Sequence, residues 1–209
     1  LSPWMNKLPG RLLHVNIIAS ALFAAVSGSS AATTATVGKI TLPELLKRNY
    51  SKSLSLGSLA GAGSLGFLIP PSMMMIVYGI VAEVSIGKLF IGGIIPGIML
   101  ASAFSLYVVV RSILNPELAP LGDLNYTWSE RIRTLPLLLP VLVLIVLVLG
   151  SIYTGWATPT EAATVGVFGS LVFAALSRSM NKEMFWEAVL GAVKTSAMIM
   201  LIVSGASYL

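Results

Sequence analysis

Long apolar runs are the feature that most limits what this chain can fold into. A helix needs about 20 mainly apolar residues to cross the hydrocarbon core of a bilayer, and several segments approach or exceed that length. Because only helices or closed barrels satisfy every backbone polar group in lipid, we expect an all-α, polytopic membrane protein. The segments are Leu12 to Gly38, Leu54 to Val81, Leu89 to Val110, Leu135 to Ile152, Thr160 to Leu176 and Phe185 to Leu209.

The composition indicates the same environment. Of the 209 residues, 56% are hydrophobic and only 10% are charged, and the mean hydropathy is +0.90. The net charge of +5 does not indicate nucleic acid, because the basic residues lie between the apolar runs, where the positive-inside rule accounts for them. The sequence has no cysteine, which excludes disulfides and thiolate metal sites. We expect a lipid bilayer around this chain, no nucleic-acid partner, and a piece of a longer protein.

The first apolar run contains a stretch without large side chains. Residues 27–36 read SGSSAATTAT, which would be poorly anchored against lipid and carries hydroxyls that compete for backbone hydrogen bonds. The sequence therefore predicts a re-entrant hairpin over 12–38, with its tip in this stretch, instead of a single crossing.

The second apolar run, 54–81, contains two adjacent prolines. In GFLIPPS at 66–72, Pro70 and Pro71 each remove an amide donor and free a carbonyl one turn earlier. Irregular backbone at membrane depth is tolerated only where it is buried in protein or lines a cavity. We therefore predict a broken helix whose break faces another part of the protein.

The positions of Lys and Arg test the hairpin independently of hydropathy. If 12–38 returns to its starting side and the next four runs each cross once, one face collects eleven basic residues and the other only Lys88. If the first run crossed instead, the ratio would be nine against three. The hairpin is favoured, the basic face is expected to be cytoplasmic, and 115–133 is expected to be a cytoplasmic connector. The eleven residues are Lys7, Arg11, Lys39, Lys47, Arg48, Lys52, Arg111, Arg131, Arg133, Arg178 and Lys182.

The predicted chemistry lies where the hairpin tip meets the broken helix. A tip presents free carbonyls at one helix end and free amides at the next, which suit a cation and an anion respectively. Hard cations such as Na⁺ take oxygen ligands. Alternatively, the small residues only allow close helix packing, as Gly57 and Gly61 do in a GxxxG pair. The Na⁺ candidates are Ser27, Gly28, Ser29, Ser30, Gly66 and Ile69, and the substrate candidates are Ser30, Thr33, Thr34, Pro70 and Ser72.

Three motifs carry a resemblance to a known family. ASALFAAVSGSSAATTATVGKI, LGFLIPPSMMMIVYGIVAEVSIGKLFIGGIIPG and GWATPTEAATVGVF are similar, in order and spacing, to the large permease subunit of tripartite ATP-independent periplasmic (TRAP) transporters. The resemblance implies a Na⁺-coupled, elevator-type secondary transporter in the bacterial inner membrane, carrying carboxylate solutes such as C4-dicarboxylates or sialic acids. It implies two partners, a small four-helix membrane subunit and a periplasmic solute-binding protein. Many relatives carry an aspartate where Thr33 stands here, so no role of that carboxylate is carried over.

The segment TPTEAA resembles a turn between two scaffold helices in the same family. Thr158 is expected to be the N-cap and Pro159 the first helical residue, while Glu161 complements the positive end of that helix. We therefore divide the chain into three parts. These are a transport region of the first repeat (1–114, with hairpin 12–38, broken helix 54–81 and helix 89–110), the connector 115–133, and the opening scaffold helices of the second repeat (134–209).

A secondary transporter accounts for the hairpin, the broken helix and the hydroxyl-rich tip together. A passive channel or pore is the alternative, because it would also use re-entrant segments. An intramembrane enzyme is a weaker alternative, since His14, the sole histidine, lies about four turns before Ser29 and paired carboxylates are absent from the sequence. We expect no catalytic residue and no cofactor, with Na⁺ acting only as a coupling ion.

Overall fold

The structure, a computed structural model, describes residues 2–5, 8–120 and 138–206, and the single residues 128, 132, 134 and 136. Every regular element in this part of the chain is a helix. The elements are α1 (Ser2–Met5), α2 (Leu12–Ser27), α3 (Ser30–Lys47), α4 (Lys52–Gly63), α5 (Leu65–Leu68), α6 (Met73–Val81), α7 (Ile86–Leu114), η1 (Pro116–Leu118), α9 (Leu139–Tyr153), α10 (Pro159–Leu176) and α11 (Lys182–Ala206).

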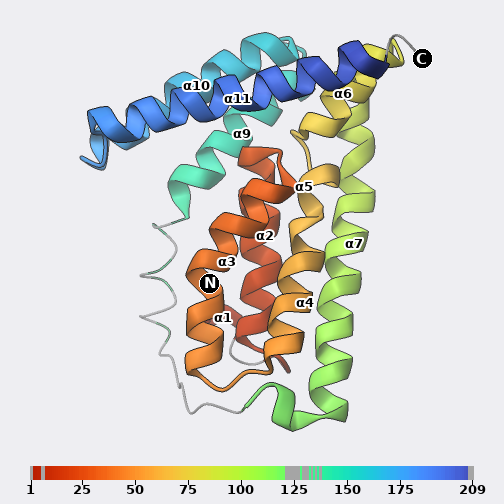
Figure 1. Cartoon of the computed structure of the whole chain (residues 1–209), viewed down its shortest axis with the longest axis vertical. Helices are drawn as coiled ribbons and strands as arrows, with labels where there is room; N and C mark the ends of the chain where they lie inside the picture. The colour runs from red at the N-terminus through yellow and green to blue at the C-terminus, as the bar shows by residue number, and fades with distance from the viewer. Residues whose placement is uncertain are drawn as a thin grey trace.

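The first half of the chain forms a bundle whose helices run along one axis (Figure 1). In that view α2 runs upward and α3 runs back down beside it. The helices α4 and α5 run upward again, and the long α7 runs downward at the right of the bundle. The helices α10 and α11 lie across the upper end of this bundle. The bundle therefore brings the turn between α2 and α3 to the same level as the segment between α5 and α6.

The turn between α2 and α3 is built from a helix stop followed directly by a helix start. Gly28 adopts the left-handed conformation (φ 60°, ψ 10°), and its N–H donates to the Ala24 carbonyl, a C-cap that glycine adopts without steric cost. Ser29 is extended, and its hydroxyl accepts a hydrogen bond from the Ala32 N–H at 3.3 Å, which is N-cap geometry. Two residues therefore reverse the chain into a helical hairpin.

The second helix of this hairpin is longer than the sequence prediction. The predicted boundary at Gly38 is wrong, because α3 continues to Lys47. Gly38 instead marks a close helix contact, since a Cβ atom there would lie 2.6 Å from a methyl carbon of Leu59 on α4. Lys39 consequently lies in the middle of α3, away from the helix end that carries Lys47, and Pro43 is accommodated inside the helix.

The second apolar run is broken where the two prolines predict a break. The α5 helix ends before Ile69, and Ile69 and Ser72 have extended backbone conformations. Pro71 cannot donate to the Phe67 carbonyl, and the Ser72 hydroxyl donates to that carbonyl at 2.8 Å instead. We call residues 69–72 the break.

The apolar core holds α2 between its neighbours. Leu13, Ile17, Leu65 and Val108 are almost fully buried and belong to one cluster. His14 is buried beside them, with Nε2 donating to the Pro9 carbonyl at 2.7 Å and Nδ1 accepting from the Ser105 hydroxyl at 2.8 Å. Because a carbonyl can only accept, these two bonds fit the neutral tautomer protonated on Nε2. His14 thus ties α2 to α7.

Several helices are long and apolar enough to cross a membrane. Among the residues that the structure describes there are four such segments, Lys52–Val81, Ile86–Leu114, Pro159–Leu176 and Lys182–Ala206, and two shorter apolar helices, α2 and α9. The 16 residues of α2 rise about 24 Å at 1.5 Å per residue, less than the hydrocarbon thickness of about 30 Å. On its own, α2 is therefore shorter than a helix that spans the hydrocarbon core.

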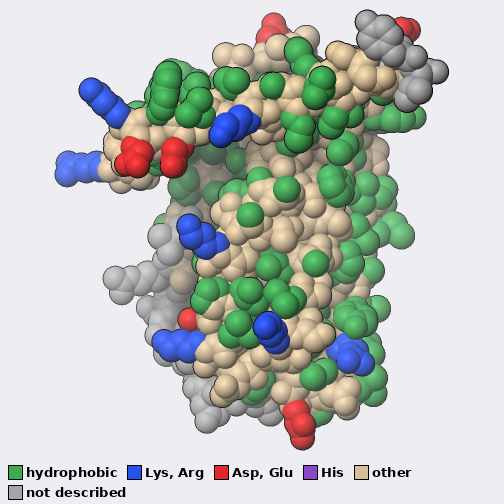
Figure 2. Space-filling view, in the orientation of Figure 1, with side chains coloured by type: hydrophobic (Ala, Val, Ile, Leu, Met, Phe, Trp, Pro, Cys, Tyr) green, Lys and Arg blue, Asp and Glu red, His purple; other side chains and the backbone are tan. Residues whose placement is uncertain are grey.

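The basic residues of the bundle gather at one end. The last residue of α3, the first of α4 and the last turn of α7 supply Lys47, Lys52 and Arg111 at the lower end in Figure 1, while Lys88 begins α7 at the other end. Figure 2 shows Lys and Arg side chains over this lower region and at the outer end of α10 and α11.

The helices α10 and α11 depart from the predicted series of crossings. Because they lie across the bundle, the turn between them, which carries Arg178 and leads into Lys182 at the start of α11, is far from the basic end (Figure 1). No residue of α11 is buried, so its apolar faces remain available to lipid or to other protein surfaces. Lys7, Arg131 and Arg133, and residues 121–127 of the predicted connector, lie outside the described residues.

Candidate functional site

The hairpin tip and the break meet, as the sequence predicts. The Met73 N–H donates to the Gly28 carbonyl at 3.2 Å. A Cβ atom on Gly28 would lie 2.8 Å from the Pro71 carbonyl oxygen, and one on Gly66 would lie 2.7 Å from the Ser30 nitrogen. The two backbones therefore approach so closely that only glycine fits at these two positions. We call this contact the tip–break junction.

The hydroxyls of the hairpin mostly support the turn. The Ser27 and Thr33 hydroxyl oxygens lie 3.1 Å apart, and the Ser29 N–H donates to the Ser27 hydroxyl at 3.4 Å. Thr33 is fully buried, and Thr34 donates to the Ser30 carbonyl of its own helix at 2.9 Å. The Thr33 hydroxyl is therefore paired with the Ser27 side chain and the Thr34 hydroxyl with the backbone of α3, so neither presents a free hydroxyl to a ligand.

The start of α3 presents free amide groups. The Ala32 N–H is taken by the Ser29 hydroxyl, and the Thr33 N–H by the Ser29 carbonyl at 2.9 Å. Within the described part of the chain, the N–H groups of Ser30 and Ala31 have no hydrogen-bond partner. Free amides at the positive end of an 18-residue helix suit the negative charge of a carboxylate.

A cavity of about 320 Å³ opens beside these amides, and we call it the tip cavity. One wall is the backbone of the tip, and the other walls are apolar side chains from α5, α6 and α11. No ionisable side chain is among the described residues that line it. The lining residues are Gly28, Ser29, Ser30, Ala31, Phe67, Met73, Met74, Val77, Met198, Ile199 and Ile202.

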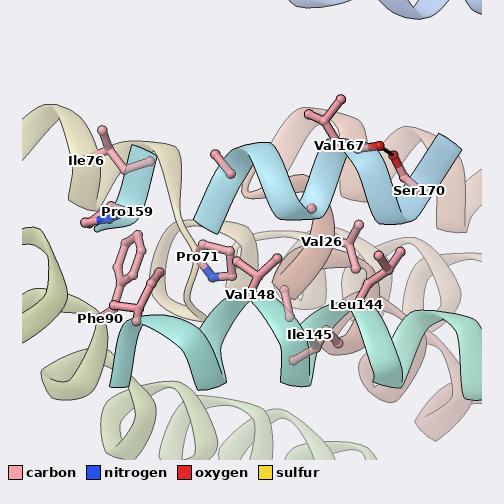
Figure 3. Close-up of a pocket in the computed structure, with 14 residues that line it drawn as sticks. Val26, Pro71, Ile76, Phe90, Leu144, Ile145, Val148, Pro159, Val167 and Ser170 are labelled. Carbon is pink, nitrogen blue, oxygen red and sulfur yellow. Dashed lines mark hydrogen bonds between the residues drawn. The ribbon is translucent and has the colours of Figure 1, made fainter. Parts of the chain in front are cut away.

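A second cavity, of about 300 Å³, lies between the tip–break junction and the hairpin of α9 and α10. Figure 3 shows Pro71 and Val26 pointing into the space between these two helices, with Phe90 of α7 at one end and Val148 of α9 below Pro71. Its lining is almost entirely apolar, and the hydroxyl of Ser170 donates to the Val167 carbonyl of its own helix. This cavity offers a ligand few polar contacts.

The structure separates the predicted site residues into two groups. Gly28, Ser29 and Ser30 line the tip cavity, and they are the candidates that a ligand there would touch. The other candidates do not line this cavity. The hydroxyls of Ser27 and Thr33 pair with each other, Thr34 bonds within α3, and Ser72 bonds to the Phe67 carbonyl. Gly66 packs on the tip, Ile69 packs on Gly97, and Pro70 is buried.

Sequence reasoning missed the apolar walls of the tip cavity. Met73 and Met74 line this cavity, and their position directly after two prolines could have indicated that they face the break. Met198 and Ile202 come from α11, more than 120 residues further along the chain. No local pattern in α11 could have predicted that contact.

A cation at this junction would depend on neutral oxygen atoms. Among the described residues, no group of three or more His, Cys, Asp and Glu side chains could hold a metal ion. The available ligands are the carbonyls and hydroxyls of the tip and the break, such as the Gly28 carbonyl, which can accept from Met73 and still use a second lone pair. Oxygen ligands of this kind suit a hard monovalent cation.

The fold and the site define a multi-pass helical membrane protein with a helical hairpin packed against a broken helix. Residues 5–209 match the family described as "Tripartite ATP-independent periplasmic transporter, DctM component". The chain belongs to this family of TRAP transporter large permeases.

Individual relatives agree with the family. The chain is 36% identical to the isethionate TRAP transporter permease protein DctMQ of Oleidesulfovibrio alaskensis over 97% of its own length and 32% of the relative. It is 37% identical to the C4-dicarboxylate TRAP transporter large permease protein DctM of Pseudomonas aeruginosa (97% of this chain, 47% of the relative). It is 35% identical to the ectoine/5-hydroxyectoine TRAP transporter large permease protein UehC of Ruegeria pomeroyi (98% and 48%). The chain thus spans half or less of each of these relatives, all of which are named as transport proteins.

The glycine contact at the tip–break junction gives a direct prediction. Gly66→Ala is expected to push Ser29 and Ser30 away from α5, because its Cβ would meet backbone atoms that cannot rotate aside, and overpacking of this kind costs about 1–3 kcal/mol. Thermal unfolding of the purified protein in detergent should show a lower Tm. Gly57→Ala is the matched control, since nothing lies within 4 Å of that Cβ position. The close helix packing expected at Gly57 is therefore wrong, because only Gly61 of that pair has a close neighbour, Phe104. An equal Tm for the two variants would contradict the close contact at Gly66.

Proposed function

We propose that this chain supplies the hairpin-bearing part of a TRAP permease, which carries out secondary transport of an organic acid coupled to Na⁺. The observation that supports this function is the tip–break junction, where carbonyls and free amides come together beside the tip cavity. Paired helix ends of this kind provide a cation site and an anion site side by side. The chain performs no covalent chemistry in this function.

The residues of the junction would have distinct roles. Na⁺ would bind to carbonyl and hydroxyl oxygens at Gly28 and Ser29, and so fix the turn in its capped geometry. The carboxylate of the solute would then bind to the N–H groups of Ser30 and Ala31 at the start of α3. Because the ion orders the same backbone that binds the solute, each ligand raises the affinity for the other.

The proposed setting is the bacterial inner membrane, with the basic end of the bundle in the cytoplasm. In this setting α2 and α3 form a re-entrant hairpin, and the hairpin-bearing bundle moves against a scaffold that includes α9 and α10, as in an elevator mechanism. A small four-helix membrane subunit and a periplasmic solute-binding protein complete the system. The solute is an organic acid, with C4-dicarboxylates and sialic acids as the first compounds to test.

The test is uptake into proteoliposomes that contain the full-length parent protein, its small subunit and its binding protein. A panel of labelled organic acids is offered with and without an inward Na⁺ gradient. The proposal predicts that at least one acid accumulates above its external concentration only when the gradient is present. Equilibration that does not depend on Na⁺ would show a passive pore instead, and it would overturn the coupling.

A variant of the tip tests the role of its hydroxyls. Ser29→Ala combined with Ser30→Ala removes the N-cap of α3, which typically costs about 1 kcal/mol, so the Na⁺ concentration for half-maximal uptake should rise about fivefold. The amount of protein inserted in the membrane should stay the same. Ser53→Ala, an exposed serine near the start of α4, is the control. An unchanged Na⁺ dependence in the tip variant would show that the Ser29 and Ser30 hydroxyls do not contribute to Na⁺ binding.

A further inference from the structure

A group of buried polar side chains lies in the interface between α2 and α4, well away from the tip cavity. Asn16 and Ser20 on α2 and Ser55 on α4 are fully buried, and Ser58 on α4 is 9% exposed. Their surroundings are apolar, because the core cluster on both helices consists of leucine, isoleucine and alanine side chains. We call these four residues the α2–α4 seam.

One hydrogen bond crosses the seam from side chain to side chain. The Asn16 Nδ2 group donates to the Ser58 hydroxyl at 3.1 Å, and that hydroxyl donates to the Ser55 carbonyl at 3.0 Å. Ser58 therefore accepts from the hairpin and donates to its own helix, so its orientation is fixed. Among the described residues, this is the side-chain hydrogen bond that joins α2 to α4.

The seam is not arranged for maximal stability. The Asn16 Oδ1 atom and the hydroxyls of Ser20 and Ser55 are buried without a hydrogen-bond partner in the described structure, and such groups are destabilising compared with apolar side chains of similar shape. A buried polar pair in an otherwise apolar helix interface has a different, well-attested effect. It favours one register of the two helices over its neighbours, because any slip leaves both partners unpaired.

Register matters here because α2 carries the tip and α4 leads to the break. A slip of one helical turn would move the tip by about 5.4 Å along α4. That shift would separate the Gly28 carbonyl from the Met73 N–H, which are 3.2 Å apart, and it would remove Gly66 from the Ser29–Ser30 peptide. Leucine and alanine contacts alone discriminate weakly between such registers, since they are not directional.

We infer that the Asn16–Ser58 hydrogen bond is a register lock, and that Asn16 is a positioning residue that sets the hairpin tip opposite the break. This inference rests on the proposed function for its effect on transport. It also has a structural readout that requires no transport. The Cβ atom of Thr34 lies 3.1 Å from the position that a Cβ atom on residue 63 would occupy, near the separation of about 3.5–4.5 Å found in disulfides. A cysteine pair at these positions reports the register of the hairpin on α4.

The experiment compares three versions of the full-length parent. The apolar version carries Asn16→Leu and Ser58→Ala, and the swapped version carries Asn16→Ser and Ser58→Asn, which keeps both groups but exchanges their helices. Ser20→Ala is the control, because it removes a buried unpaired hydroxyl without changing the lock. Each is examined for its Tm, for disulfide yield with Thr34→Cys and Gly63→Cys, and for the Na⁺ dependence of uptake.

The register lock predicts that the apolar version keeps or raises its Tm, loses at least half of the disulfide yield, and needs about fivefold more Na⁺ for half-maximal uptake. The swapped version should recover both the disulfide yield and the Na⁺ dependence, and Ser20→Ala should match the parent in these two quantities. If the apolar version gives the same disulfide yield as the parent, the register lock is overturned and apolar packing sets the register. If the apolar version does not fold, a swapped version that folds with a low disulfide yield would overturn it equally.

The two hypotheses fail in different ways. If the parent itself shows no Na⁺-dependent uptake, the proposed function is wrong, while the disulfide yields still decide whether the lock exists. If uptake by the parent depends on Na⁺ but the disulfide yield and the Na⁺ dependence are the same in all versions, only the register lock is wrong.

Discussion

The contact between two interrupted helices determines most of what is distinctive in this structure. The hydrogen bond from the Met73 N–H to the Gly28 carbonyl, at 3.2 Å, joins the end of one hairpin helix to the start of α6. Gly66 lets the opposite side of the break approach the start of α3. Because both segments give up regular hydrogen bonding at this point, each supplies partners that the other lacks. The tip cavity exists because these two irregular segments meet.

A site made from backbone groups has chemical consequences. The tip cavity has no ionisable side chain in its described lining, so the polar groups that the proposed function offers to a solute are helix ends and hydroxyls. Such groups are fixed by the fold and need little rearrangement to bind an ion or a carboxylate. Their affinity therefore depends on how accurately α2, α3 and α5 are placed, which makes the packing of the bundle part of the binding chemistry.

The sequence predicted where helices begin and end better than it predicted how distant helices pack together. The two prolines identified the break, and the small residues of 27–36 identified the segment that contains the turn, because both signals act within a few residues. Thr158 as N-cap and Pro159 as the first helical residue are also as predicted, and the structure adds that Glu161 completes a capping box with Thr158. The continuation of α3 past Gly38 was missed because contact with Leu59, and not chain conformation, explains that glycine. The position of α11 across the bundle follows from no local pattern.

Hydrogen–deuterium exchange of the full-length parent in lipid nanodiscs tests the central claim most directly. Peptides covering 27–36 and 66–74 would be followed with and without Na⁺, with a peptide from the middle of α7 as the internal reference. The account predicts that Na⁺ slows exchange in both peptides together and leaves the reference unchanged, because one ion orders both sides of the junction. Unchanged exchange in both peptides, or protection of only one of them, would contradict a shared ion site.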